Sequence, residues 1–238
     1  MITLVVDSEK ILKETIIVDN LADINHIKNV FRKNIGETIR AVDGKFEYIC
    51  EIKEIENRTL KLKILSSREE NSSEIEIEAG ISLLKNEKMD LTIQKLTEIG
   101  IKKIIPVAAK RSIVKLEKKK DKWDTIVRET LKQCQGISPT KISEIRKISE
   151  ISYADYDLII VPYEAEEEFY LKQLLKKIEK EKKIKKILYI IGPEGGFEKE
   201  EIEFLKDKGA YIISLGKRIL RAETAAIVTG GVLVNEFQ

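Results

Sequence analysis

The sequence predicts two domains, a small β-rich domain over residues 1–70 and a larger α/β domain over residues 71–238 built on a mainly parallel sheet. Short runs with alternating polar and apolar residues fill the first 68 positions. Residues 66–73 are polar and lack periodicity, which is typical of a linker. Beyond them, strand-like apolar runs alternate with helical patterns, as in sheets covered by helices on both faces.

In the N-terminal part, strands are expected over residues 2–6, 15–18, 37–42, 45–55 and 59–65. The pair Asp43-Gly44 lies between two of them and is a tight-turn signal. One helix is expected over residues 21–32, with Asn20 as its cap. Many short strands with a single helix favour a small β-barrel.

In the C-terminal part, an opening strand is expected over residues 74–84, and strands and helices then alternate to the end of the chain. Further strands are expected over residues 103–107, 157–161, 187–191 and 211–215. Helices are expected over residues 87–99, 121–135, 166–182, 199–208 and 222–235.

The charge of the chain is nearly balanced, with 43 Lys and Arg against 41 Asp and Glu. Between Lys102 and Lys147, however, 14 basic residues face 5 acidic ones, a local net charge of 14 − 5 = +9. Such clustering fits a phosphate-binding face. It fits equally well a solvated surface in a Lys-rich chain, and charge alone leaves both readings open.

Cys50, Cys134 and the single histidine, His26, lie too far apart in the sequence to form a metal-binding pattern, so no metal is expected. The beginning of the chain has no basic stretch followed by an apolar run, and no segment is apolar enough to span a bilayer. We therefore expect a cytoplasmic protein with no membrane partner.

Three loops that follow predicted strands are candidates for chemistry, because ligands of open α/β sheets bind at the carboxyl ends of strands. They are Pro162-Tyr-Glu164, Gly192-Pro-Glu-Gly-Gly-Phe197 and Gly216-Lys-Arg-Ile-Leu-Arg221. The glycines of the second loop let the backbone approach a ligand closely.

The acids Glu198, Glu200 and Glu201 follow the glycine loop at the start of a predicted helix. They satisfy the helix dipole, so a phosphate is disfavoured there, and a ligand without phosphate or with a positive charge fits better. S-adenosylmethionine meets both conditions, although an ordinary strand-to-helix turn also has such glycines.

In the third loop, Ile219 and Leu220 lie between cations. This apolar pair suits an adenine ring, and Arg221 suits a polar or anionic RNA group. The alternative is that both apolar residues belong to the core.

These motifs resemble the 16S ribosomal RNA uridine-N3 methyltransferase (RsmE) family of the SPOUT class, and the resemblance covers nearly the whole chain. It rests on the glycine loop and on Leu215-Gly with Ile219-Leu-Arg-Ala-Glu-Thr-Ala225, on Lys95-Leu-Thr-Glu-Ile-Gly100, on Pro106 with Arg111-Ser112, on Trp123, Ile126, Glu129 and Gln133, and on His26-Ile27, Val30-Phe-Arg32, Gly36-Glu37 and Val42-Asp-Gly44.

The resemblance implies a PUA-like N-terminal β-barrel, a C-terminal SPOUT domain with a deep trefoil knot, and a homodimer with its active site near the interface. The implied reaction is S-adenosylmethionine-dependent methylation of N3 of a specific uridine in 16S rRNA of the small ribosomal subunit. The expected cofactor-binding residues are Val161, Pro162, Tyr163, Gly192, Pro193, Glu194, Gly195, Gly196, Leu215, Gly216, Ile219, Leu220, Arg221, Thr224 and Ala225.

The expected RNA contacts are Arg32, Lys95, Arg111 and Gln133. Two segments depart from the family pattern. Ile2-Thr-Leu4 replaces an arginine or aromatic pair, and Gln133-Cys-Gln-Gly-Ile137 lacks the usual arginine.

The catalytic candidates are Arg221, Glu194 and Glu223. We expect Arg221 to stabilise the uracil oxygen as charge develops. Glu194, Glu223 or a water that they orient would accept the N3 proton, and Glu223 is alternatively structural, paired with Arg221 or capping its helix.

Four other residues have a possible structural role as well as a possible functional one. We expect His26 to be a half-buried helix residue and Trp123 a packing anchor, while Arg111 and Gln133 suit ordinary surface positions as well as RNA contacts. Two other functions stay open, methylation of another RNA such as tRNA and non-catalytic RNA binding.

Overall fold

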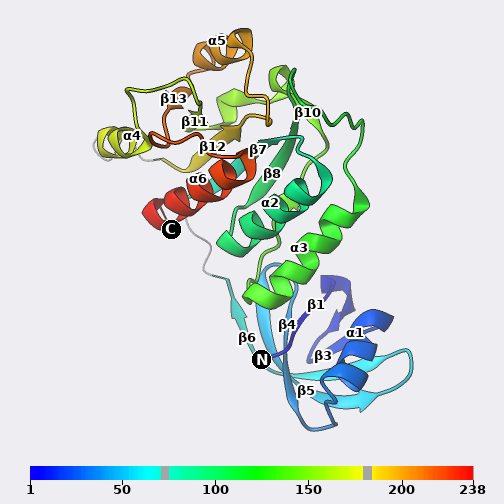
Figure 1. The fold of residues 1–238 in the computed structure, drawn as a ribbon. Helices are drawn as coiled ribbons and strands as arrows, with labels where there is room; N and C mark the ends of the chain where they lie inside the picture. The colour runs from blue at the N-terminus through cyan, green and yellow to red at the C-terminus, as the bar shows by residue number, and fades with distance from the viewer. Residues whose placement is uncertain (71–74, 179–183, 238) are drawn as a thin grey trace. The chain divides into compact units, whose positions relative to one another are not determined.

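The computed structural model describes residues 1–70, 75–178 and 184–237, and these form two compact units (Figure 1). The N-terminal unit comprises Met1–Ser72 together with Arg128–Pro139, and the C-terminal unit comprises Ser73–Val127 with Thr140–Gln238. The predicted boundary between residues 70 and 71 adjoins residues outside the described part.

The N-terminal unit contains a mixed six-stranded sheet in the order β1-β4-β5-β6-β3-β2, which confirms the predicted β-rich character. Only β1 and β4 pair in parallel. Strands β1 and β2 are the two edges of the sheet, and within the described residues they do not pair with each other to close it. The strands are β1 (Thr3–Val5), β2 (Ile11–Leu12), β3 (Thr15–Val18), β4 (Thr38–Val42), β5 (Phe46–Ile55) and β6 (Leu60–Glu69), and the short 3-10 turn η1 is Ser8–Lys10.

Strand β6 extends to Glu69, so the prediction of a linker beginning at residue 66 is wrong over residues 66–69. The alternation of polar and apolar residues ends near Leu65, but the backbone continues to pair with β5. Residues 71–73 of the predicted linker lie outside the described residues.

The predicted helix over residues 21–32 is divided in two, α1 (Leu21–Asn25) and a π-helical turn, η2 (His26–Val30). As predicted, Asn20 caps α1, since its Oδ1 accepts a hydrogen bond from the Asp23 backbone N–H at 3.1 Å. Ile24 and Ile27 are buried against the sheet, which explains why this amphipathic segment folds onto it.

Buried charges join residues 128–139 to the N-terminal unit. Asp23, which is 4% exposed, accepts hydrogen bonds from Arg128 Nη2 at 3.1 Å and Lys132 Nζ at 2.6 Å. Arg40, equally buried, donates to the Gln135 carbonyl oxygen at 2.8 Å. Because an unpaired buried charge is costly, these partners stabilise the segment on the sheet, an arrangement that the sequence did not predict.

The C-terminal unit contains the predicted parallel sheet, in the order β10-β8-β7-β12-β11-β13, with β9 also paired to β8. Every pairing in this sheet is parallel. Its strands are β7 (Glu76–Ser82), β8 (Lys103–Ala108), β9 (Lys141–Ile142), β10 (Arg146–Lys147), β11 (Leu158–Pro162), β12 (Lys186–Ile191) and β13 (Tyr211–Ile213). The two-residue strands β9 and β10 are too short to give a periodic signal, and the sequence did not predict them.

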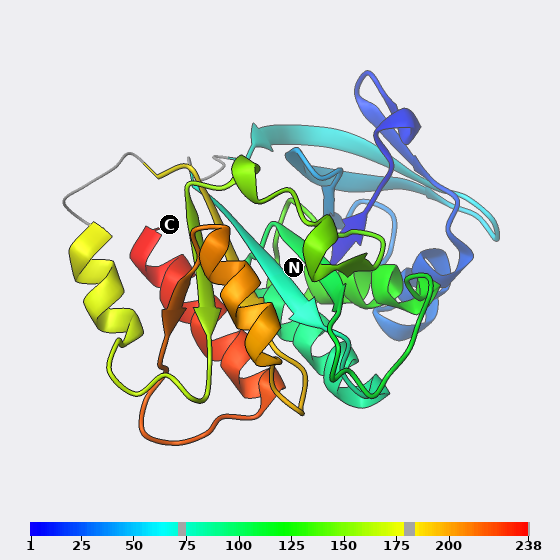
Figure 2. The same cartoon turned by 90° about the horizontal axis from the view of Figure 1, so that it is seen from above.

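Helices cover both faces of this sheet, because side chains of successive strand residues point to opposite sides. Ile187 and Tyr189 pack in one core with residues of α2 and α6, whereas Leu188 and Ile190 pack in another with residues of α5. Figure 2 shows α5 and α6 on opposite faces. The helices are α2 (Asn86–Ile99), α3 (Asp121–Cys134, whose last turns belong to the N-terminal unit), α4 (Leu171–Ile178), α5 (Lys199–Asp207) and α6 (Ala222–Phe237), with 3-10 turns η3 (Ile148–Glu150) and η4 (Tyr153–Asp155).

The predicted helix over residues 166–182 begins five residues later, at Leu171, because the Glu166 side chain holds a turn first. Its carboxylate accepts hydrogen bonds from the backbone N–H groups of Glu168 at 2.9 Å and Phe169 at 3.0 Å. The predicted end of this helix falls outside the described residues.

Gly230 allows α6 to lie close to the sheet, and this contact gives a testable prediction. A Cβ atom at Gly230 would lie 2.7 Å from the buried Tyr189 hydroxyl, which itself donates to the Ala226 carbonyl oxygen at 3.2 Å. We expect Gly230→Ala to lower the free energy of unfolding by about 1–3 kcal/mol through overpacking. Urea denaturation measures the change.

The neighbouring Gly231 is the matched control, because nothing lies within 4 Å of a Cβ built there. Gly231→Ala should leave stability unchanged or raise it by roughly 0.5–1 kcal/mol, the usual helix preference for alanine. Equal effects of the two substitutions would contradict the proposed close contact.

Candidate functional site

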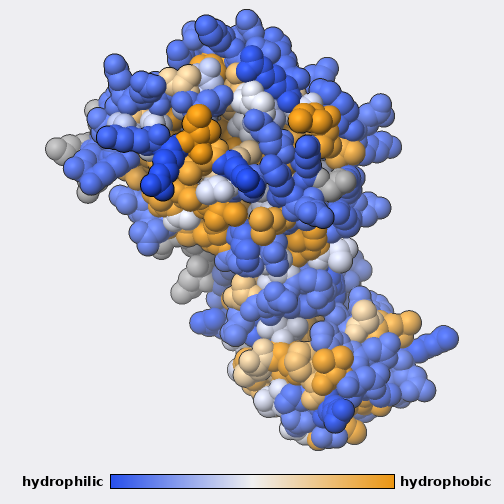
Figure 3. Space-filling model, in the orientation of Figure 1, coloured by the Kyte–Doolittle hydropathy of each residue, from blue (hydrophilic) through white to orange (hydrophobic). Residues whose placement is uncertain are grey.

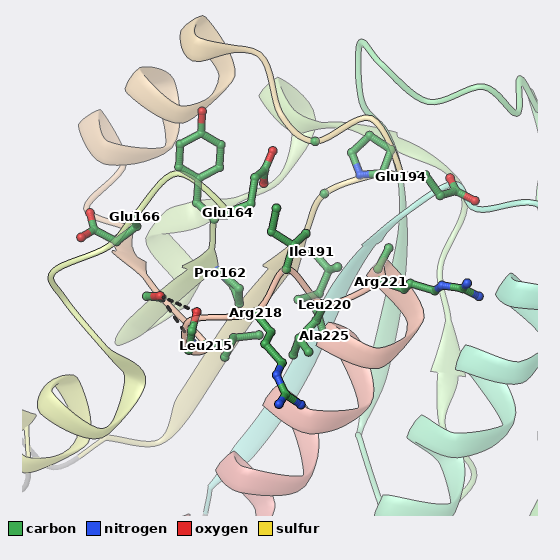
Figure 4. A pocket seen from close by; sticks show the side chains of 18 of the residues that line it. Pro162, Glu164, Glu166, Ile191, Glu194, Leu215, Arg218, Leu220, Arg221 and Ala225 are labelled. Atoms are coloured by element: carbon green, nitrogen blue, oxygen red, sulfur yellow. Dashed lines mark hydrogen bonds between the residues drawn. The ribbon is translucent and has the colours of Figure 1, made fainter.

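The ends of β11, β12 and β13 meet at the carboxyl edge of the parallel sheet, where the loops after them surround a cavity of about 840 Å³ (Figure 4). Glu194 and Arg221 lie at one side of this cavity in the figure, Glu166 and Leu215 at the other, and Ile191, Leu220 and Ala225 between them. The sequence predicted this location from the position of the loops.

Thirteen of the fifteen residues predicted to bind the cofactor line the cavity, all except Val161 and Thr224. Val161 is fully buried in the core on the α5 side of the sheet, and Thr224 is exposed on α6. Both are adjacent in sequence to lining residues, but their side chains point elsewhere.

The glycine loop supplies a wall of bare backbone. Gly196 has φ +69°, and a Cβ there would lie 2.0 Å from Oε1 of Glu164. At Gly195, a Cβ would lie 3.2 Å from the Cβ of Arg111. The positive φ of Gly196 favours glycine there, and a side chain at that position would displace the Glu164 carboxylate. At Gly195 a side chain would press on Arg111.

The start of α5 is satisfied by its own side chains. Glu198 and Glu201 form a reciprocal capping box, in which the Glu198 backbone N–H donates to Oε2 of Glu201 at 2.9 Å. The helix N-terminus thus needs no external anion, in agreement with the sequence argument against a phosphate ligand.

The same two carboxylates fasten the loop after β8 to the glycine loop, an arrangement that we call the α5 brace. Arg111 Nε and Nη2 donate to the two carboxylate oxygens of Glu198 at 2.8 and 3.0 Å, and Arg111 Nη1 donates to the Gly195 carbonyl oxygen at 3.1 Å. The Lys110 backbone N–H donates to Oε1 of the buried Glu201 at 2.9 Å. Glu198 raises the pKa of Arg111, which therefore stays charged in this bidentate pair.

The third loop exposes its apolar and basic side chains. Ile219 is 83% exposed, so the reading that it belongs to the core is wrong, whereas Leu220 packs against the core at the cavity wall. Arg221 lines the cavity and makes no ion pair with any described residue.

Lys88, in the first turn of α2, lines the cavity and was not predicted. Its Nζ lies 3.4 Å from Oε1 of Glu194 and 3.7 Å from Oε2 of Glu223. Glu223 is 8% exposed, and its Oε2 has no hydrogen-bond partner in the described part of the chain. Its charged neighbour is therefore Lys88, and the expected pairing with Arg221 is not present.

Further lining residues were also missed, and they carry much of the cavity's charge. Those outside the predicted set are Lys88, Glu164, Glu166, Glu167, Tyr170, Ile191, Ser214, Lys217, Arg218 and Ala222. The backbone hydrogen bonds to Glu166 lower the pKa of its carboxyl group, so it is ionised at neutral pH. Glu164 and Glu166 could have been predicted from the sequence as cavity residues, since both follow the end of a predicted strand.

Two of the four residues predicted to contact RNA belong to each unit. Arg32 and the exposed Gln133 belong to the N-terminal unit, and Lys95 and Arg111 to the C-terminal unit, where they pair with Glu98 and Glu198. Many cations of the basic stretch 102–147 likewise contact carboxylates, among them Lys103, Lys119 and Lys122.

The structure tests the burial predicted for two residues. Trp123 is 2% exposed and is a packing anchor, as predicted. His26 is exposed, not half-buried, because the π-helical turn directs its ring outward onto Phe31.

The described ranges contain no group of three or more His, Cys, Asp or Glu side chains arranged to hold a metal ion. Nor does any helix within them combine the length and apolar composition needed to cross a bilayer.

Comparison with known proteins assigns families to both units. Residues 71–234 match the model of an RNA methyltransferase domain, and residues 18–65 match that of an RNA methyltransferase PUA domain. The chain is 30% identical to ribosomal RNA small subunit methyltransferase E of Bacillus subtilis, covering 86% of this chain and 84% of that relative. The chain belongs to the ribosomal RNA small subunit methyltransferase E family.

Other members of this family agree with the assignment. The methyltransferase E of Buchnera aphidicola subsp. Schizaphis graminum is 32% identical, covering 90% of this chain and 87% of the relative. A crystal structure of methyltransferase E from Neisseria gonorrhoeae bound to S-adenosyl methionine has a TM-score of 0.83 and 25% identity, covering 99% of this chain and 97% of the other. The family assignment confirms the predicted RNA methyltransferase and its PUA-type N-terminal domain.

The position of Lys88 gives a second prediction, that it acts on methyl transfer by positioning Glu194. We expect Lys88→Met to lower kcat about 5- to 50-fold, and Lys88→Arg to restore most of it. If Lys88 acts through Glu194, Lys88→Met should add little further loss in a Glu194→Gln background. Steady-state methylation assays measure kcat for Lys88→Met, Lys88→Arg, Glu194→Gln and the double variant.

Lys85→Met is the matched control, since Lys85 is exposed next to the same helix start and lies outside the cavity lining. Independent, additive losses from the Lys88 and Glu194 substitutions would contradict the proposed coupling.

Proposed function

We propose that this chain transfers the methyl group of S-adenosylmethionine to N3 of a specific uridine in 16S rRNA of the small ribosomal subunit. The observation that carries the proposal is the cavity at the carboxyl edge of the sheet, with its bare glycine wall and with Arg221 and Glu194 at one side. Membership of the methyltransferase E family supports the choice of RNA substrate.

The residues that line the cavity fit this cofactor. A volume of about 840 Å³ has room for it and for part of a nucleotide. The lining combines carboxylates, including Glu164 and Glu166, with cations such as Arg218, which suits a ligand with both positive and negative groups. The self-capped α5 provides no anion site, and the cofactor has no phosphate.

When bound, S-adenosylmethionine supplies a methyl group made electrophilic by a positively charged sulfur. The glycine loop and the loop over residues 215–221 would hold it, with Leu220 and Ala225 against its flat ring. The α5 brace keeps the glycine loop in place while the RNA base binds.

The residues at the Arg221 side of the cavity would act on the uracil. Its N3 proton has to leave for the nitrogen to attack, and Glu194, which lines the cavity, or a water held by it would accept that proton. Arg221, with no carboxylate partner in the described structure, would stabilise the negative charge that develops on the uracil oxygen. Glu223, buried beside Lys88, keeps that lysine in position and is structural.

We also propose that the C-terminal domain contains a trefoil knot and forms a homodimer. A further proposal is that the PUA-like domain ends at residue 70. Exposed apolar side chains on α2, α6 and the third loop support a dimer, because such side chains gain from burial by a second copy. They are Leu91, Ile219, Val228 and Val232. We further propose a cytoplasmic location, which a ribosomal RNA substrate supports.

The role of Arg221 gives a third prediction. Arg221→Ala should lower kcat about 10²–10³-fold while the dissociation constant for S-adenosylmethionine changes little, because the guanidinium acts on the uracil. Calorimetry measures cofactor binding, and a methylation assay on small subunits lacking the modification measures turnover. Lys199→Ala, an exposed cation outside the cavity lining, is the control.

Equal losses of binding and turnover in Arg221→Ala would contradict the proposed role of this residue.

To separate an enzyme from a non-catalytic RNA-binding protein, thermal unfolding is followed with S-adenosylhomocysteine. We expect a rise of the midpoint that increases with ligand concentration. No rise would favour the binding protein.

A further inference from the structure

A second cavity, of about 670 Å³, lies wholly within the N-terminal unit and is not used by the proposed reaction. Its floor is apolar, with Leu4 and Ile27 both buried, and its rim is polar. It is lined by Met1, Ile2, Thr3, Leu4, Asp23, His26, Ile27, Phe31, Lys33, Thr38, Glu129, Lys132 and Gln133.

The π-helical turn η2 produces a pair of stacked rings at this cavity. The Phe31 backbone N–H donates to the His26 carbonyl oxygen at 3.0 Å, and this five-residue step places the two side chains over each other. The ring centroids lie 4.8 Å apart with an angle of 16° between the planes. Both residues are exposed, Phe31 to 46%, so the stack offers an aromatic surface to a further ring.

The next residue, Arg32, has φ +50°, which is strained for a residue with a side chain. This conformation turns the chain so that Lys33, whose backbone N–H donates to the Ile27 carbonyl oxygen at 3.0 Å, lines the same cavity. Arg32 itself is exposed and makes no ion pair with the described residues. A cation without an ion-pair partner among the described residues therefore follows the aromatic pair in the chain.

The carboxylate and lysine side chains that line the cavity are already paired. Asp23 contacts Lys132, Lys132 also contacts Glu129 at 2.7 Å, and Lys33 contacts Glu37 at 2.6 Å. The interior thus favours a neutral, flat ligand with hydrogen-bonding edges over a phosphate. Gln133 and Thr38 on the rim supply both donors and acceptors for such edges.

We propose that this cavity binds one unpaired nucleobase of the RNA substrate, stacked on the Phe31–His26 pair, with Arg32 contacting the adjoining phosphate. Proteins read single-stranded RNA by stacking its bases on aromatic rings and by hydrogen bonds to their edges. The inference rests on the proposed action on RNA and adds a nucleobase subsite in the PUA-type domain. Figure 3 shows apolar surface where Figure 1 draws α1 and the turn after it, and the exposed large apolar side chains of this segment are Leu21, Val30 and Phe31.

The test uses the full chain, without S-adenosylmethionine, and single-stranded RNA oligonucleotides in which 2-aminopurine replaces one base. Stacking should quench the fluorescence of 2-aminopurine at one position, and a duplex of the same sequence should bind more weakly. We expect Phe31→Ala to abolish the quenching and to weaken binding about 5- to 100-fold, the range for loss of one stacked base. Phe31→Trp should restore both.

Ile35→Ala is the matched control, because Ile35 is 64% exposed in the same unit and does not line the cavity. It should leave affinity unchanged. Arg32→Ala should weaken binding and reduce the salt dependence by about one phosphate contact, without affecting the quenching.

Unchanged RNA affinity in Phe31→Ala, with the fold verified by urea denaturation, would overturn the proposal and leave the surface to another class of partner. The outcome is independent of catalysis. A chain that binds single-stranded RNA through Phe31 but transfers no methyl group would keep this subsite and contradict the proposed function.

Discussion

The arrangement of the active-site loops depends on the two carboxylates that begin α5. Glu198 and Glu201 cap their own helix, and they also hold Arg111 and the Lys110 backbone. The glycine loop lies between these contacts, fastened through the Gly195 carbonyl oxygen. Because the start of α5 is capped by its own side chains, the same carboxylates that hold the loop also leave no anion site at that helix start.

The sequence predicted the architecture of both units because their patterns are local. Strands such as β12, apolar at every position from Ile187 to Ile191, are buried on both faces, and this is typical of a parallel sheet. The same pattern of strands and loops predicted which loops surround the cavity, since strand ends of a parallel sheet meet at one edge. The predicted start of a helix was wrong where a side chain bonds to the backbone. At Glu166 the carboxylate accepts backbone hydrogen bonds and forms a turn where a helix was expected.

What the sequence could not predict depends on contacts between distant segments. Lys88 is 106 residues from Glu194 (194 − 88 = 106), and nothing in its neighbours marks it as a cavity residue. The pair of Arg111 with Glu198 joins segments that are likewise distant in the sequence, so the sequence did not predict it. The π-helical turn has no periodic signature, so the stack of His26 on Phe31 was hidden within an apparently regular helix.

Nucleoside mass spectrometry of 16S rRNA from a strain in which the gene for this chain is deleted tests the proposed methylation directly. We expect 3-methyluridine to be lost at one position and restored by the intact gene. An unchanged level of 3-methyluridine, or the loss of a different modification from tRNA, would contradict it.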